Sequence, residues 1–211
     1  MARKSYNEGC LAAHALDLIG DRWAILVLRE LMLGPKRFST IKSGLPGIAT
    51  NVLTQRLEGL EAGGLLERRD LPPPSLGHIY ALTAAGDGTR GILDALCRWG
   101  MRQPGYDPRK FISPTALMFS LFTFYIPAPK RLHAGFVMGD ESFVAEAGPH
   151  GLTASVGAAE GDIILKGTGN EMSAVIYGRK PLETMVADGR IQASGDLAVG
   201  QALIDRFTLK A

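Results

Sequence analysis

Three short polar side chains stand at helical spacing in one stretch of the first half of the chain. A helix is expected from about Ala49 to Ala62, and steps of about 100° per residue put Asn51, Thr54 and Gln55 on one side of it. The amide of Asn or Gln offers a donor and an acceptor that match adenine, and Thr can contact a thymine methyl. This pattern favours hydrogen bonding to base edges, and the alternative is an ordinary solvated helix face.

Basic side chains precede and follow this helix. Arg37 comes before it, and Arg68, Arg69 and His78 come after it. Cationic side chains so placed can reach phosphates or a neighbouring minor groove. The alternative for the arginines of the hairpin and for His78 is that they are solvated strand ends. We predict the following DNA-contacting set: Arg37, Thr50, Asn51, Thr54, Gln55, Arg56, Arg68, Arg69 and His78. Glu58 shares the polar helix face and would repel phosphate unless it faces a cytosine or lies beyond the groove.

The net charge of +2 is unevenly divided along the chain. Residues 1–110 carry 15 Lys and Arg against 11 Asp and Glu, whereas residues 111–211 carry 8 against 10. The basic excess therefore lies entirely in the first half, which suggests a polyanion partner there. Ordinary sampling of surface charge is the alternative.

Two further helices are expected before the polar one. Apolar residues recur at helical spacing from Cys10 to Ile19, and Gly20 is a natural stop. Asp21 can cap a second helix with little polar face, which predicts that this helix is buried by its neighbours. A short segment from Phe38 to Lys42 then completes a helix-turn-helix order.

A hairpin is expected after the polar helix. Leu65 to Arg69 and His78 to Leu82 are typical of strands, and three consecutive prolines stiffen the connection between them. A hairpin directly after such a helix is a wing.

These residues resemble the HxlR-type winged-helix regulators over about residues 6–103. The resemblance implies a homodimer with one winged domain per subunit, the helix from about Ala49 to Ala62 in the major groove of double-stranded DNA, and the hairpin as the wing. It rests on linked motifs that begin with Cys10 and continue with Ala15-Leu16-Asp17-Leu18-Ile19-Gly20-Asp21-Arg22-Trp23, Leu28-Arg29-Glu30-Leu31, Arg37-Phe38, Leu45-Pro46-Gly47-Ile48, Asn51-Val52-Leu53-Thr54-Gln55-Arg56-Leu57, Tyr80-Ala81-Leu82-Thr83 and Trp99-Gly100.

The resemblance also bears on the helix cap and on the dimer. Ala49 stands where the family often has a serine cap, so Thr50 is expected to cap instead. A long helix from about Ala85 to Arg102 places apolar residues at spacings suited to pairing with the first helix of the other subunit. These residues are Ile92, Leu93, Leu96, Cys97 and Trp99. Such a dimer sets two recognition helices about 34 Å apart, which predicts a pseudo-palindromic operator.

The resemblance also implies a second role for Cys10, because some members of the family carry a reactive cysteine near this place that senses oxidants or electrophiles. A thiol near the start of a helix has its thiolate stabilised by the helix dipole. The alternative is a small packed apolar residue, and packing in the core or the dimer is expected for Cys97.

The pattern of residue types changes after residues 103–108, a stretch that contains Pro and Gly. Ser113 and Pro114 are typical of a helix start, and short strand-like runs follow, punctuated by glycines. Two helical stretches, a last strand and a closing helix capped by Asp196 complete the pattern. We predict an α+β fold with a mainly antiparallel sheet, and a division of the chain into domains at 1–105 and 106–211.

This half resembles the sterol carrier protein type-2-like fold over about residues 112–208, on motifs such as Gly178-Arg179-Lys180-Pro181-Leu182-Glu183 and Gly189-Arg190-Ile191. The resemblance implies an apolar cavity for a small-molecule effector, and simple core packing is the alternative. The expected lining residues are Met118, Leu121, Phe122, Tyr125, Met172, Val175, Ile176 and Met185.

Several classes of protein are disfavoured by what the sequence lacks. The histidines have no metal-ligand spacing and no serine sits in a GxSxG elbow, so neither an enzyme nor a cofactor is expected. Two distant cysteines favour a reducing compartment. No apolar stretch is long enough to span a membrane and the first residues do not resemble a secretory signal, which predicts a cytoplasmic protein.

The leading hypothesis is a homodimeric DNA-binding transcriptional regulator whose second domain binds an apolar effector. One alternative is a lipid or apolar-ligand carrier with an inactive DNA domain, and another is a regulator that uses Cys10 as a redox sensor.

Overall fold

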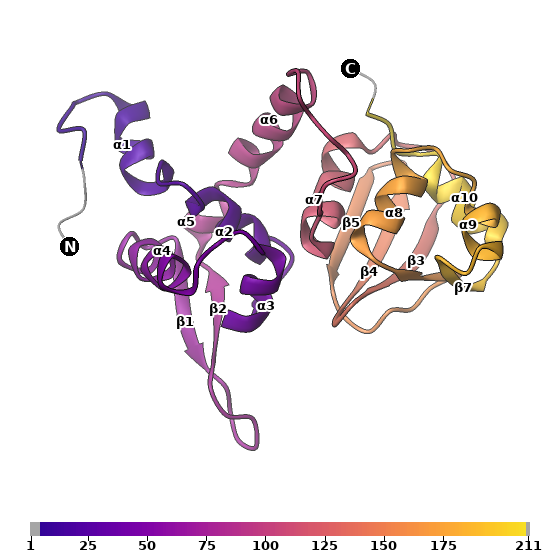
Figure 1. Cartoon of the computed structure of the whole chain (residues 1–211), viewed down its shortest axis with the longest axis horizontal. Helices are drawn as coiled ribbons and strands as arrows, with labels where there is room; N and C mark the ends of the chain where they lie inside the picture. Colours follow the sequence, from indigo (N-terminus) through magenta and orange to yellow (C-terminus); the bar gives the residue numbers. More distant parts are fainter. Residues whose placement is uncertain (1–4, 210–211) are drawn as a thin grey trace. The chain divides into compact units, whose positions relative to one another are not determined.

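The computed structural model describes residues 5–209, which form two compact units (Figure 1). The first unit extends to Leu93 and the second begins at Asp94, while the division into domains after residue 105 stays a prediction. The first four residues, which entered the expectation that no secretory signal is present, lie outside the described residues.

The first unit begins with four helices in the expected order. The second helix is buried by the others: Val27 and Leu28 are fully buried, as is Ile41 on the third helix. Leu53, Leu57 and Leu60 complete the core from the fourth helix. The four helices are α1 (Leu11–Ile19), α2 (Ala24–Leu31), α3 (Phe38–Gly44) and α4 (Thr50–Ala62).

Two helix starts differ from expectation. Asp21 does not cap α2, because Trp23 occupies the cap position with a left-handed φ of 80° and Asp21 instead forms an ion pair with Arg56. Thr50 does not cap α4, because Ala49 already provides the extended backbone before the helix and Thr50 is its first helical residue. Neither start has a capping side chain, so tertiary packing holds both in place.

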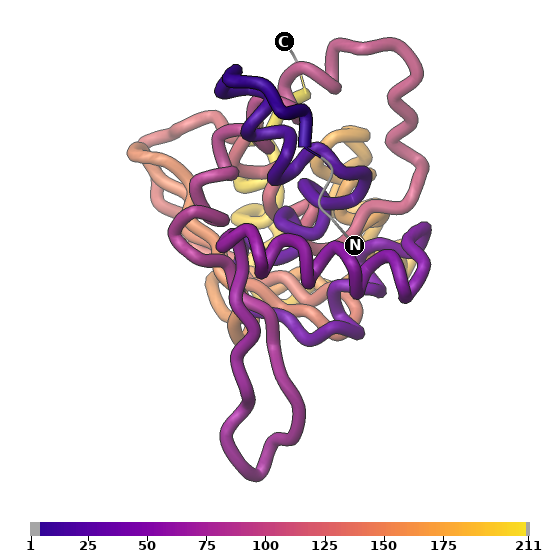
Figure 2. The backbone as a smooth tube through the Cα atoms, turned by 90° about the vertical axis from the view of Figure 1, so that its left-hand side faces the viewer, coloured from indigo at the N-terminus to yellow at the C-terminus, as the bar shows by residue number. Residues whose placement is uncertain are grey.

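The wing is an antiparallel hairpin of β1 (Leu66–Asp70) and β2 (His78–Leu82) (Figure 2). Lys36 adds a bridge to the outer side of β2, donating its N–H to Tyr80 O at 3.0 Å and accepting from Tyr80 N at 2.8 Å. The segment between α2 and α3 is thereby tied to the wing by backbone hydrogen bonds.

The long helix expected from about Ala85 to Arg102 is two helices, α5 (Ala84–Asp87) and α6 (Arg90–Met101). Thr89 marks the break, since its buried hydroxyl donates to Gly86 O at 2.7 Å. Gly86 packs directly on the carbonyl of Leu65, where a Cβ would collide with backbone. The residue that precedes β1 therefore packs closely against α5.

The second unit contains a five-stranded sheet in the order β5-β4-β3-β6-β7. Only β3 and β6 are parallel, and the other neighbours are antiparallel, which agrees with the expected mainly antiparallel sheet. The strands are β3 (Leu132–Met138), β4 (Glu141–Gly148), β5 (Gly151–Val156), β6 (Ile163–Gly167) and β7 (Gln192–Gly195).

Four helices complete the second unit. Ser113, Thr168 and Asp196 cap three of them with side-chain oxygens, as Ser113 and Asp196 were expected to do. Alternate residues of β3 face the core, and Leu132 and Phe136 are buried on that face. The helices are α7 (Pro114–Phe124), α8 (Gly169–Ile176), α9 (Leu182–Ala187) and α10 (Leu197–Ile204).

A buried arginine anchors the end of this unit. The guanidinium of Arg206 donates to Ala147 O and to the Tyr125 hydroxyl, both at 3.2 Å, and to Lys130 O. The side chain is buried, and within residues 5–209 its acceptors are carbonyl and phenol oxygens rather than carboxylates. The Tyr125 hydroxyl in turn donates a hydrogen bond to Gly148 O at 2.8 Å.

Candidate nucleic-acid interface

The exposed face of α4 carries the short polar side chains that the sequence pattern placed there. Asn51, Thr54 and Gln55 are exposed, while Leu53 and Leu57 are buried on the opposite face. Thr54 Oγ1 donates back to Thr50 O at 3.1 Å. The amides of Asn51 and Gln55 have no hydrogen-bond partner within residues 5–209, so both keep a free donor and acceptor.

The basic residues of the predicted set fall into different environments. Arg68 is exposed on β1, whereas Arg69 Nε donates to Glu67 Oε1 at 2.7 Å. Arg56 is half-buried and paired with Asp21, which leaves less of its charge for a phosphate. Arg37 Nη1 donates to Leu76 O at 2.9 Å and so connects the start of α3 to the tip of the wing.

His78 lies partly buried at the base of the wing. Its Nε2 is 3.1 Å from the Tyr80 hydroxyl, and the two rings meet edge to face with centroids 5.3 Å apart. Burial raises the pKa of Tyr80, and the charge of Arg68 opposes that rise. The phenol therefore stays protonated near neutral pH, and its hydroxyl can donate a hydrogen bond to His78.

A hollow of about 310 Å³ lies between α4 and the wing. Two carboxylates, Glu58 and Glu61, share it with Arg68 and His78. A phosphate would be repelled by the carboxylates, so the backbone of DNA is better accommodated outside this hollow. The complete lining is Phe38, Thr54, Leu57, Glu58, Glu61, Arg68, His78 and Tyr80. Phe38, Glu61 and Tyr80 were not among the predicted DNA contacts, because only the pairing of α4 with the wing brings them together.

A buried charge cluster supports the interface from behind. The carboxylate of Glu30 on α2 is fully buried and accepts from Lys36 Nζ at 3.0 Å and from Arg29 Nη2 at 2.8 Å. Gly44 at the end of α3 packs against the same carboxylate, leaving no room for a side chain. Because the backbone of Lys36 also pairs with the wing, Glu30 links α2, α3 and β2. A charged residue within an apolar helix was the sequence signal for this cluster.

Cys10 is exposed at the cap position of α1. Hydrogen bonds from the backbone N–H groups of Ala13 and Ala12 lower the pKa of its thiol. The thiolate is thus favoured relative to an ordinary cysteine, as expected for a thiol at a helix start.

The apolar residues predicted to line an effector pocket lie mostly in the core of the second unit. The two described hollows have none of the eight in their linings, and only Phe122 and Tyr125 are partly exposed. The other six, each at most 2% exposed, are Met118, Leu121, Met172, Val175, Ile176 and Met185.

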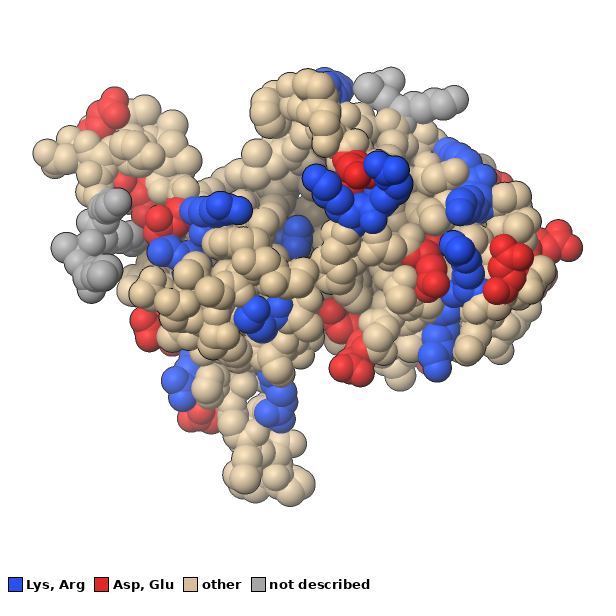
Figure 3. All heavy atoms as spheres, viewed as in Figure 1, with Lys and Arg blue, Asp and Glu red and all other residues tan. Residues whose placement is uncertain are grey.

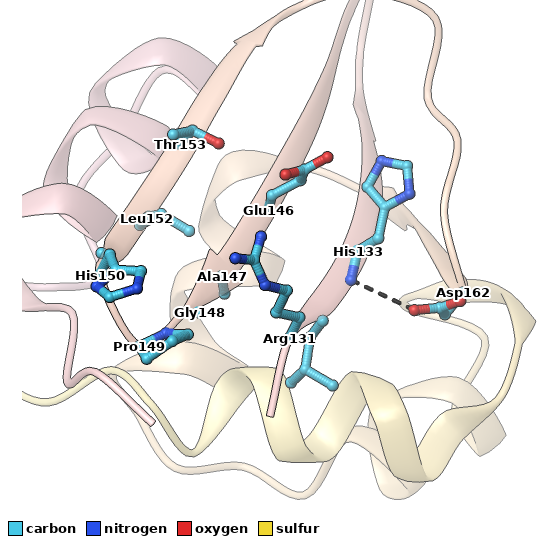
Figure 4. Close-up of a pocket in the computed structure, with 12 residues that line it drawn as sticks. Arg131, His133, Glu146, Ala147, Gly148, Pro149, His150, Leu152, Thr153 and Asp162 are labelled. Atoms are coloured by element: carbon cyan, nitrogen blue, oxygen red, sulfur yellow. Dashed lines mark hydrogen bonds between the residues drawn. The ribbon is translucent and has the colours of Figure 1, made fainter. Parts of the chain in front are cut away.

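The second unit has a hollow of about 420 Å³, lined by both charged and apolar residues, at the strands β3, β4 and β5 (Figure 4). Arg131, His133 and Glu146 project from the sheet there, and Asp162 accepts from the backbone N–H of His133 at 3.4 Å. His133 and Glu146 are direct cross-strand neighbours. Both signs of charge meet in this hollow.

Residues 5–209 contain no group of three or more His, Cys, Asp or Glu arranged to hold a metal ion. Over the same residues, no helix has the length and apolar character needed to cross a bilayer.

Comparison with known proteins assigns the first half of the chain to a protein family. A profile of the HxlR-like helix-turn-helix family matches residues 18–107. The HTH-type transcriptional regulator YtcD of Bacillus subtilis is 39% identical over 102 residues, which are 47% of this chain and 78% of YtcD. The chain belongs to the HxlR-like helix-turn-helix family.

Further HxlR-like relatives match the same region. An HTH-type transcriptional regulator of Methanothermobacter thermautotrophicus is 42% identical over 93 residues, covering 43% of this chain and 70% of that protein. The reduced form of the transcriptional regulator YodB from B. subtilis is 32% identical, covers 46% of this chain and 97% of that chain, and has a TM-score of 0.42. The second unit lies largely outside these matches.

Proposed function

We propose that this HxlR-like protein is a sequence-specific DNA-binding transcriptional regulator in which α4 reads the major groove. The observation that carries the proposal is the exposed face of α4, where Asn51 and Gln55 present unpaired amides above a buried apolar face. Arg37 and Arg68 supply nearby charge for phosphates. The relatives named as HTH-type transcriptional regulators support the same function.

We infer that the protein acts as a homodimer through α1 and α6. Both helices expose large apolar side chains: Leu11 is 87% exposed on α1, and Trp99 is 63% exposed on α6. Leu16 on α1 and Ile92 and Leu96 on α6 are exposed as well. Covering these side chains in a dimer removes apolar surface from water, and the resulting two-fold symmetry favours a pseudo-palindromic operator.

Selection from random duplexes tests the DNA-binding function. Wild-type protein should enrich a pseudo-palindromic sequence, and Gln55→Ala should bind that duplex about 5- to 150-fold more weakly, as expected for loss of one base-reading pair. Gln192→Ala on the exposed strand β7 is the matched control and should bind like wild type. Failure to enrich any sequence would contradict the proposal and would favour the carrier alternative.

We also propose that the second unit binds an apolar effector which alters DNA affinity. Its support is the concentration of soft methionine and aromatic side chains around α7 and α8, which can repack around a ligand. Since these side chains fill the core, a ligand would have to displace them. Binding of cis-parinaric acid, followed by its fluorescence, should weaken for Met118→Gln; equal binding by both proteins, or none by wild type, would contradict an apolar site among these residues.

A second candidate mode of control is oxidation at Cys10. The lowered pKa of this exposed thiol favours it, because the thiolate is the form that attacks peroxide. Hydrogen peroxide should change DNA affinity of the wild type, whereas Cys10→Ser should respond weakly. An unchanged response in Cys10→Ser would contradict this mode.

A further inference from the structure

The tip of the wing is apolar and uncharged. Residues 71–77 connect β1 and β2 and contain no Lys, Arg, Asp or Glu. Leu76 is 84% exposed, and the three prolines Pro72, Pro73 and Pro74 are exposed beside it. In the space-filling view the end of the hairpin is free of charged side chains, while basic and acidic groups gather at its base (Figure 3). The tip therefore offers no charged side chain to a phosphate.

The tip is also held in a fixed shape. Leu71 N donates to Gly77 O at 2.9 Å, and Ser75 N donates to Pro72 O at 3.1 Å. Arg37 fixes Leu76 from the body of the unit through its hydrogen bond to Leu76 O. Gly77 has a φ of +97°, which few other residues adopt. Prolines restrict the remaining backbone, so the tip loses little entropy when it binds a partner.

The surroundings of the tip point to DNA as that partner. The hairpin protrudes from the same unit that carries α4 (Figure 2), and Arg68 and Arg69 lie on its strand β1. A wing beside a major-groove helix meets the adjacent minor groove, with the basic residues of its base near the phosphates. Apolar side chains such as Leu and Pro can enter a minor groove and partly unstack a base step.

We propose that the wing tip inserts Leu76 into the minor groove as an apolar wedge that opens a base step beside the sequence read by α4. This inference rests on the proposed DNA-binding function. Arg37 acts as the positioning residue, because it holds the backbone of Leu76 without itself entering the groove. Pyrimidine–purine steps unstack most readily, so the protein selects such a step outside the bases that α4 contacts.

In this proposal, the salt dependence of binding and the unstacking of a base step come from different residues. Phosphate contacts come from the arginines and set the dependence of affinity on salt, whereas unstacking comes from Leu76. Replacing Leu76 with serine therefore leaves the salt dependence unchanged while it removes base unstacking and the preference for a flexible step. An isosteric change of the tip that keeps an apolar side chain, Leu76→Met, retains both.

The test uses full-length protein and a duplex that wild-type protein enriches from a random pool. The adenine analogue 2-aminopurine is placed at the steps flanking the α4 site, and its fluorescence rises when the base is unstacked. Wild type and L76M should raise the fluorescence, and L76S should not, with binding about tenfold weaker and an unchanged salt slope. S75A, a substitution at the neighbouring exposed residue, is the matched control and should behave as wild type.

The outcomes distinguish the wedge from the function on which it rests. If wild type enriches a duplex but leaves 2-aminopurine fluorescence unchanged at every flanking step, the wedge is wrong and the DNA-binding function stands. The wedge is equally wrong if L76S matches wild type in fluorescence and affinity, since the tip would then serve a different partner, such as another protein. If no duplex is enriched, the DNA-binding function itself is wrong.

Discussion

At the scale of single residues, the exposed side chains of the first unit divide into those that are free and those that are already engaged. Asn51 and Gln55 have unpaired amides, and Arg68 is exposed, whereas Arg56 is paired with Asp21 and Arg69 with Glu67. A side chain that must break an internal contact gains less from DNA than a free one. Base reading and phosphate binding should therefore rest on the free residues.

Arg68 and Asn51 should respond differently to substitution. Arg68→Ala is expected to weaken binding to all duplexes and to reduce the dependence of log affinity on log salt by about one unit, because one phosphate contact is lost. Asn51→Ala should keep the salt slope and relax the preference at one base pair. Fluorescence anisotropy over a range of salt concentrations measures both. A changed slope in Asn51→Ala would mean that its contact is to a phosphate.

Cys10 should react at lower pH than an ordinary cysteine. Hydrogen bonds from Ala13 and Ala12 lower the pKa of the thiol, so the thiolate persists as pH falls below the range in which a free cysteine is protonated. The rate of alkylation by iodoacetamide, followed by mass spectrometry, should reach half its maximum at a lower pH than for N-acetylcysteine. A coincident profile would show that the helix start does not stabilise the thiolate.

At the scale of elements, periodicity predicted most helices and strands, and packing decided where they begin and end. The buried face of α4 and the strand order of the wing follow from local pattern. The break between α5 and α6 was not predicted, and Thr89 marks it with a buried hydroxyl that donates to Gly86 O. The apolar lining expected around α7 stays a prediction: most of its residues are buried, and a helix that is apolar on all sides predicts burial without specifying a cavity.

Loss of the Glu30 carboxylate should destabilise the first unit strongly. Glu30→Ala leaves buried Lys36 without its carboxylate partner, and removal of one member of a buried ion pair costs about 3–5 kcal/mol. Urea unfolding monitored by Trp23 fluorescence, in a Trp99→Phe background, reports on this unit.

Glu67→Ala is the matched control for that measurement. Glu67 pairs with Arg69 on the exposed wing, and such surface pairs contribute about 0–1 kcal/mol. Equal decreases in the free energy of unfolding of the two variants would contradict the view that burial makes Glu30 important for stability.

At the scale of the whole molecule, the chain combines an HxlR-like unit with a second unit that the known relatives do not cover. Among the exposed large apolar residues, Leu11 and Leu16 lie on α1, and Ile92, Leu96 and Trp99 lie on α6. The family resemblance together with the apolar spacing predicted α6 as a dimer helix, and the exposure of Ile92, Leu96 and Trp99 supports that proposal.

A charge on α6 should disrupt the homodimer. Trp99→Asp places a carboxylate on the proposed interface, where burial of an unpaired charge is costly, and should shift the protein from dimer to monomer. Analytical ultracentrifugation measures the change, with Phe111→Asp as a control, since Phe111 is a similarly exposed aromatic residue outside α1 and α6. A variant that stays dimeric would place the interface elsewhere.

The carbonyl-bound Arg206 has a consequence for the response of the protein to acid. Its acceptors are the backbone oxygens of Ala147 and Lys130 and the hydroxyl of Tyr125, none of which takes up a proton as pH falls through the carboxylate range. An anchor of this kind keeps its hydrogen bonds in acid, unlike an arginine held by Asp or Glu. The closing segment of the second unit should therefore stay bound to β4 and to the segment that contains Tyr125 and Lys130 under conditions in which carboxylate-based ion pairs elsewhere in the chain are broken.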